Sequence, residues 1–124
     1  MLKIEEGVIY ITRGDDAVID AQLTMTGGGM YEMQPGDTVT LSVRELPSGE
    51  SRLVFASTSA PGSTRIIINS ADTQEAEVGR YSADIQLRTE EGKRYTVWPE
   101  LEGAERYKTG NMKNFVIMPE VTME

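Results

Sequence analysis

The chain has 124 residues, of which 39% are hydrophobic, a formal net charge of −8, and neither cysteine nor histidine. This length suits one domain and is too short for two independent cores. The composition excludes disulfides, thiolate metal sites and a Ser-His-Asp triad, and the acidic charge disfavours binding to nucleic acid or to an anionic membrane.

The first seven residues carry acidic side chains and lack the apolar stretch of a signal peptide. No segment of the sequence approaches the roughly 20 apolar residues of a transmembrane helix. We therefore expect a soluble protein that is made in the cytoplasm and is not inserted into a membrane.

The first apolar run, residues 8–12, predicts a strand, and alternation of apolar and polar residues over 17–25 predicts a second one. Between these runs stands Arg13-Gly14-Asp15, the tripeptide that integrins recognise. A tripeptide recurs by chance, and Gly14 is explained by a turn that needs positive φ, so we interpret this segment as a structural turn. Arg13 is expected to pair with a neighbouring aspartate of the same loop.

Three consecutive glycines, residues 27–29, precede the bulky apolar side chains of Met30, Tyr31 and Met33. Exposed methionine and aromatic side chains mark protein contact sites, because they bury much apolar area with an adaptable shape. Together with Trp98, these three residues are the candidate partner-contact residues. A second interpretation stays open at this point, in which the loop folds back and caps one end of the domain.

Unbroken alternation over residues 38–44, directly after a Pro-Gly-Asp turn, predicts a third strand. β-branched and aromatic runs predict strands over residues 53–57 and 64–69. A short helical turn is expected next, with Asp72 as its cap and Glu75 in the answering position.

A Gly-x-Tyr motif that ends at Tyr81 opens the next alternating run, residues 81–88. In immunoglobulin-like sandwiches, a tyrosine near the start of strand F bonds its hydroxyl to the backbone a few residues upstream. Tyr81 has this position, and Ala83 stands two residues later, where antibody domains carry a cysteine. We therefore predict a tyrosine corner in a core that closes by packing alone.

The last two predicted strands, residues 94–98 and 114–118, flank a long polar insertion over 99–113. A Glu-Glu-Gly-Lys loop, residues 90–93, joins the first of them to the preceding strand as a hairpin. The regular spacing predicts one all-β domain over residues 1–124, an immunoglobulin-like β-sandwich of about seven to eight antiparallel strands. The residues expected to share its core are odd-numbered: Ile19, Leu23, Val39, Leu41, Val43, Tyr81, Ala83, Ile85 and Leu87.

Four stretches of the sequence can be compared with a known family: residues 11–16, 37–44, 68–87, and 91–97 with 115–121. In this order they resemble the N-terminal immunoglobulin-like domain of phage baseplate upper proteins and of related phage or prophage tail proteins. The resemblance implies a non-enzymatic structural component of a tail or baseplate. Its implied partners are other tail or baseplate proteins and further copies of the chain, in the virion tail or in the bacterial cytoplasm during assembly.

No catalytic residue, metal ligand or cofactor is assigned. Asp15, Asp16 and Asp20 crowd one loop as calcium ligands do, but their spacing matches no known calcium loop. Glycoside hydrolysis by two carboxylates would need a sugar cleft with aromatic walls, and the chain has only one Trp, two Phe and five Tyr. The alternative function is that of a soluble binding module for carbohydrate or for a cell-surface partner.

Overall fold

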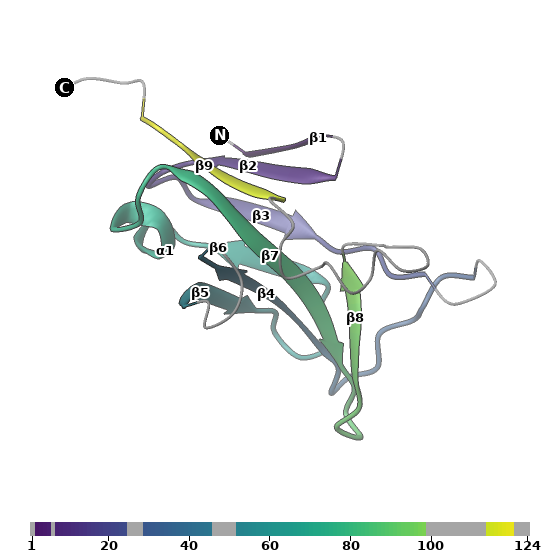
Figure 1. Ribbon diagram of the computed structural model, residues 1–124. Helices are drawn as coiled ribbons and strands as arrows, with labels where there is room; N and C mark the ends of the chain where they lie inside the picture. Colours follow the sequence, from purple (N-terminus) through teal and green to yellow (C-terminus); the bar gives the residue numbers. More distant parts are fainter. Residues whose placement is uncertain (1, 6, 25–28, 46–51, 99–113, 121–124) are drawn as a thin grey trace.

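The computed structural model describes residues 2–5, 7–24, 29–45, 52–98 and 114–120. These residues form nine strands and one short helix, and the protein is all-β as predicted (Figure 1). In chain order the elements are β1 (Leu2–Glu5), β2 (Val8–Thr12), β3 (Ala17–Asp20), β4 (Thr38–Arg44), β5 (Leu53–Thr58), β6 (Arg65–Ile68), α1 (Ser70–Gln74), β7 (Gly79–Arg88), β8 (Arg94–Trp98) and β9 (Phe115–Met118).

Two sheets enclose the core. The larger sheet has the order β1-β2-β9-β7-β4-β5, and the smaller sheet consists of β3 and β6. One side of the long strand β7 pairs with β4, whereas its other side pairs first with β9 and then with β8. The predicted all-β sandwich is therefore confirmed. Because β2 runs parallel to β9, the larger sheet is mixed rather than wholly antiparallel.

The core follows from the alternation of apolar and polar side chains along the strands. All nine odd-numbered residues predicted to share the core are buried in a single cluster, together with isoleucines from β2, β6 and β9 and with two phenylalanines. Phe55 of β5 and Phe115 of β9 meet edge to face with ring centroids 5.9 Å apart, although β7 and β4 stand between their strands. The larger sheet therefore curls around the core. Burial of each Leu or Ile stabilises the fold by about 1.5–3 kcal/mol.

The predicted tyrosine corner is present at the start of β7. Tyr81 is buried, and its hydroxyl donates a hydrogen bond to the backbone carbonyl of Glu77. Burial raises the pKa of Tyr81, so its hydroxyl stays protonated and able to donate. Ala83, two residues later, is buried as predicted.

A buried asparagine fills the gap that β9 and β8 leave along the edge of β7. Ala83 donates its N–H to Asn114 Oδ1 at 2.7 Å, and Asn114 Nδ2 donates to the carbonyl oxygen of Ala83 at 2.9 Å. The side-chain amide thus takes the place of a strand residue in the ladder. The strand predicted over residues 114–118 did not reveal this role, because Asn114 and Ala83 are 31 positions apart in the sequence.

Two local predictions need correction, and one strand was not predicted. The strand expected over residues 17–25 ends at Asp20, although Leu23 still reaches the core. The helix begins at Ser70, two residues before Asp72, and the Asp72 side chain accepts the N–H of Asn69 at 2.8 Å. Asp72 is therefore the answering residue of the cap rather than the cap itself. Strand β1 was not predicted, because four residues with largely exposed side chains give a weak periodic signal.

Candidate partner-contact surface

The loop that carries three of the candidate contact residues is anchored at both of its described ends. Thr24 and Met30 form an isolated bridge, and Tyr31 donates its N–H to the carbonyl oxygen of Leu23 at 2.9 Å. At the other end, Asp37 donates its N–H to the carbonyl oxygen of Gln34 at 3.0 Å, which closes the predicted turn before β4. Residues 25–28, which include two of the three glycines, lie outside the described residues.

The Asp37 carboxylate is buried and joins two loops at one end of the sandwich. Oδ2 accepts the hydroxyl of Tyr31 and the N–H of Gln34, the latter at 2.9 Å. Oδ1 accepts the N–H of Glu90, in the β7–β8 hairpin, at 3.0 Å. Gly36 lies so close to this hairpin that a Cβ atom there would stand 2.6 Å from Cβ of Glu90. The loops are therefore packed together and not held apart.

These contacts shift the pKa values of Tyr31 and Asp37 in opposite directions. The hydrogen bond to Asp37, followed by burial, raises the pKa of Tyr31 to about 12. The same bond, followed by the one from the Gln34 N–H, lowers the pKa of Asp37 against the opposing effect of burial. At neutral pH the pair consists of a protonated phenol and an ionised carboxylate, which is the arrangement that the hydrogen bond requires.

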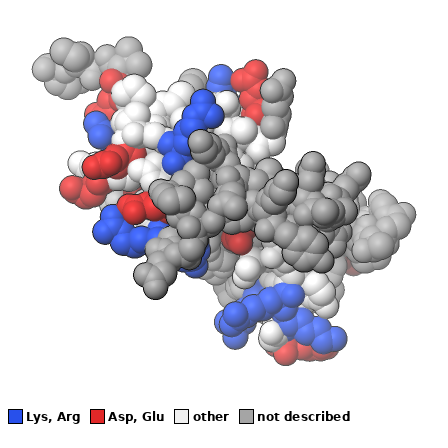
Figure 2. Space-filling model, in the orientation of Figure 1, with Lys and Arg blue, Asp and Glu red and all other residues white. Residues whose placement is uncertain are grey.

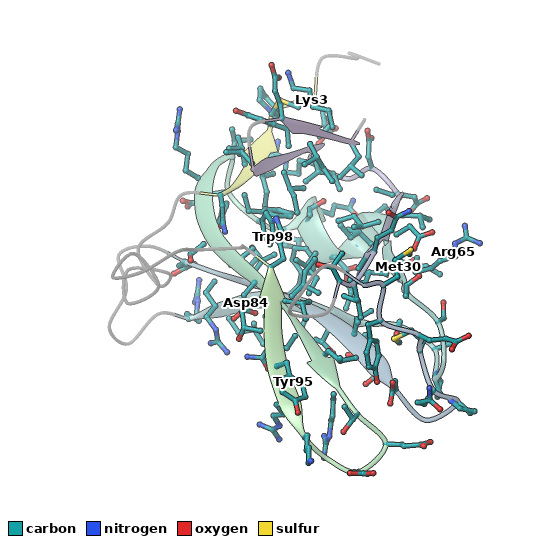
Figure 3. All side chains as sticks on the ribbon, turned by 90° about the vertical axis from the view of Figure 1, so that its right-hand side faces the viewer. Lys3, Met30, Arg65, Asp84, Tyr95 and Trp98 are labelled. Atoms are coloured by element: carbon teal, nitrogen blue, oxygen red, sulfur yellow. The ribbon has the colours of Figure 1, made fainter. Side chains whose placement is uncertain are left out.

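The four candidate contact residues do not form one exposed patch. Met30 is 69% exposed, whereas Tyr31, Met33 and Trp98 are partly buried and pack against the core. Trp98 lies opposite Ile85 in the β7–β8 ladder, and Figure 3 shows it well apart from Met30. The described part of the loop thus caps the sandwich, as in the second interpretation, and Met30 alone of the four presents a large free apolar surface. A contact role for these residues stays a prediction.

The Arg13-Gly14-Asp15 segment is a turn that is docked on α1. Gly14 has φ of 82° and donates its N–H to Thr73 Oγ1 at 2.9 Å. Arg13 forms an ion pair with Glu120 at 3.3 Å, a partner that the sequence did not indicate. These bonds give Arg13 and Gly14 structural roles in the fold.

Most of the aspartates that suggested calcium bind the protein's own polar groups. Asp16 accepts the N–H of Ser70 at 2.7 Å, and Asp20 accepts the hydroxyl of Thr64 at 2.5 Å. Among the described residues, no group of three His, Cys, Asp or Glu side chains is placed to hold a metal ion. The same carboxylates thus shape loops at several places in the molecule.

Asp84 has a raised pKa on the outer face of the larger sheet. Burial raises the pKa of this half-buried carboxyl, and the nearby Arg44 partly offsets the effect. A carboxyl group with a raised pKa can act as a general acid, but glycoside hydrolysis needs a second carboxylate close by. In the described strands of this face the other carboxylate is Glu5, which lies on β1 and is separated from β7 by β2 and β9.

Charge is divided between this face and the rest of the molecule. The described strands place five cations and two carboxylates on the outer face of the larger sheet: Lys3, Arg44, Arg80, Arg88 and Arg94 with Glu5 and Asp84. The other described residues carry four cations and twelve carboxylates. In Figure 2, basic side chains gather at the lower end of the molecule, where Figure 1 places the β7–β8 hairpin.

Sheet edges and apolar side chains are also exposed. In the described residues, β1 is paired on one side only, and the small sheet consists of just β3 and β6. Ile4 on β1 is 56% exposed, and Val18 and Ile67, which are cross-strand partners, are also exposed. Unpaired strand edges with apolar side chains are surfaces on which another chain can dock.

Comparisons with known proteins gave no match. No family model matches the sequence, and neither the curated proteins nor the solved structures include a significant match. No helix formed by the described residues is long and apolar enough to cross a membrane.

Proposed function

We propose that this chain is a non-enzymatic domain that works through protein–protein contacts, as a structural component of a phage or prophage tail or baseplate. The division of charge carries the proposal: a cationic sheet face stands on a chain whose other described surfaces are strongly acidic. Such a face attracts the acidic surface of a protein partner and orients it during encounter. A chain with a net charge of −8 would repel nucleic acid overall, which favours protein as the partner.

The use of polar groups within the domain supports a structural role. Asp37, Asn114 and Thr73 are buried, and all three bond to backbone groups of other segments. Catalytic groups need instead to face a substrate with an acid, base or nucleophile in reach. These three buried polar side chains therefore hold loops and strands together.

The assignment to a tail or baseplate rests on the sequence resemblance, and the sandwich is compatible with it. The proposed partners are other tail or baseplate proteins, and the proposed location is the particle tail, or the bacterial cytoplasm while particles assemble. In such assemblies, repeated domains contact one another and their neighbours through surfaces of the kind described above.

Retention experiments test this function. The purified chain is immobilised and exposed to a lysate of the source cells after prophage induction, and retained proteins are identified by mass spectrometry. Tail or baseplate proteins should be retained, and less of them at high salt. The matched control is the double variant R88E/R94E, which reverses two exposed charges of the cationic face and should retain several-fold less. Equal retention by this variant, or retention of no tail protein, would contradict the proposal; binding to a glycan array would then favour the carbohydrate-binding alternative.

A further inference from the structure

Strand β1 is the outermost described strand of the larger sheet, and its free edge has the features of a self-complementary interface (Figure 1). We propose that a second copy of this chain pairs with it, β1 against β1, antiparallel and about a two-fold axis at Ile4. The inference deepens the proposed function, because it names one partner and one contact of a domain that we infer to work in an assembly.

The backbone geometry of β1 points the N–H and C=O of Ile4 away from β2, where a second copy could pair with them. Ile9 donates its N–H to the carbonyl oxygen of Asn114, so this N–H points from β2 toward β9 and away from β1. Ile4 stands opposite Ile9 in the β1–β2 ladder, which is therefore a pair without mutual hydrogen bonds. In an antiparallel strand the N–H and C=O of such a residue point to the other side. The backbone of Ile4 thus points out of the sheet edge, ready to pair with Ile4 of a second copy.

The charges of β1 select this register. With the two-fold axis at Ile4, Lys3 lies opposite Glu5 of the second copy, and Glu5 lies opposite its Lys3. These pairs occupy the positions without mutual hydrogen bonds, where side chains are closest. Moving the axis to Lys3 would place two lysines opposite each other, and moving it to Glu5 would oppose two glutamates. A two-fold axis midway between two neighbouring residues is excluded, because it would place residues of the outer face of one copy opposite residues of the inner face of the other.

The side chains of β1 are already placed for this contact. Lys3 Nζ lies 4.9 Å from the ring centroid of Tyr10 and 3.1 Å from Glu5 Oε2, so both charges stand on the outer face. Figure 3 shows Lys3 at the border of the molecule. On the opposite face, the exposed Ile4 would cover Ile4 of the second copy and remove apolar surface from water. Four residues per chain bury less than the roughly 1,200 Å² of a stable interface, so the isolated dimer should be weak.

Sedimentation of the purified chain over a concentration series, up to about millimolar, tests the proposal. The wild type should show a reversible monomer–dimer equilibrium. K3E and E5K each create two like-charge pairs and should weaken dimerisation about tenfold or more. The double variant K3E/E5K restores both opposite-charge pairs and should dimerise as the wild type does. An equimolar mixture of the two single variants should form the mixed dimer more readily than either variant alone forms its own dimer.

I4P provides a test that does not depend on charge. It removes the outward N–H of Ile4 and leaves the β1–β2 hydrogen bonds in place, because Ile4 makes none with Ile9. This variant should stay monomeric with unchanged circular dichroism.

A wild type that is monomeric at the highest concentration, single variants that dimerise normally, or a double variant that fails to recover would each overturn the inference. A monomeric wild type that still retains tail proteins would leave the proposed function standing, whereas a dimer that retains none would contradict only that function.

Discussion

The hydroxyl of Tyr31 donates a hydrogen bond to the buried carboxylate of Asp37, six residues further along the chain. This contact ties the loop of the candidate contact residues to the start of β4, and the other carboxylate oxygen ties it to the β7–β8 hairpin. One end of the sandwich therefore depends on a single ionised side chain, and its loss has consequences that can be measured.

Replacing the Asp37 carboxylate should destabilise the domain. Asp37→Asn keeps the size of the side chain but turns one accepting oxygen into a donor, which then faces the N–H or O–H group that it used to accept. Hydrogen bonds to a charged group contribute about 1.5–3 kcal/mol each, so the free energy of unfolding should fall by at least about 2 kcal/mol. Urea denaturation measures this loss. The control is Glu32→Gln, at an exposed carboxylate in the same loop, which should change the free energy by less than about 0.5 kcal/mol.

The Tyr31–Asp37 pair should stabilise the fold within a defined range of pH. The folded pKa of Asp37 is lowered, so its contribution is present above the unfolded value of about 4 and is lost as pH falls through the folded value. The folded pKa of Tyr31 is raised to about 12, so its contribution is complete below the unfolded value of about 10 and is lost as pH rises through about 12. Melting temperatures of the wild type and Tyr31→Phe should therefore differ most between these limits and converge outside them. A difference that is constant from acid to alkaline pH would show that ionisation of the pair does not matter.

Removing the Asn114 amide should destabilise the centre of the larger sheet. Asn114→Ala leaves the N–H and C=O of Ala83 without the partners that they have in the wild type, in a buried position. Each of the two unsatisfied groups lowers stability by about 1–3 kcal/mol, so a total loss of about 2–6 kcal/mol is expected in urea denaturation. Gln22→Ala, at an exposed amide, is the control. A loss no larger than that of the control would mean that water replaces the amide without penalty.

The tyrosine corner should contribute a smaller amount. Tyr81→Phe removes the hydroxyl that bonds the carbonyl of Glu77 and keeps the buried ring, so the expected loss is about 0.5–1.5 kcal/mol. Tyr95→Phe, at a ring that is 52% exposed, is the matched control and should leave the thermal melt unchanged. Identical melts of the two variants would argue against a stabilising corner.

Local sequence patterns were sufficient to predict much of the fold. The odd-numbered side chains of the runs over residues 38–44 and 81–88 are buried, and such a face is visible in the sequence because burial selects apolar residues at a period of two. Tyr81 was recognisable for a similar reason, since its hydrogen bond spans four residues and belongs to a known local motif. Elements whose stability is encoded within a few residues can thus be predicted.

The contacts that organise the candidate surface join distant parts of the chain. Arg13 reaches Glu120 over 107 positions, Asp37 reaches Glu90 over 53, and Asn114 reaches Ala83 over 31. No periodicity marks such partners, since each depends on how the strands are ordered in the sheet. For the same reason, sequence could group Met30 with Trp98 as contact residues but could not show that they lie apart.

Immunogold electron microscopy of particles from the source cells tests the central claim most directly, namely that the chain is a component of a phage or prophage tail. Antibodies against the purified domain are applied to intact particles, and antibodies absorbed with the domain are the control. Specific gold on the tail or baseplate, lost after absorption, is the expected result. Particles whose tails carry no more gold than the absorbed control, while the same antibodies detect the chain free in the lysate, would contradict the claim.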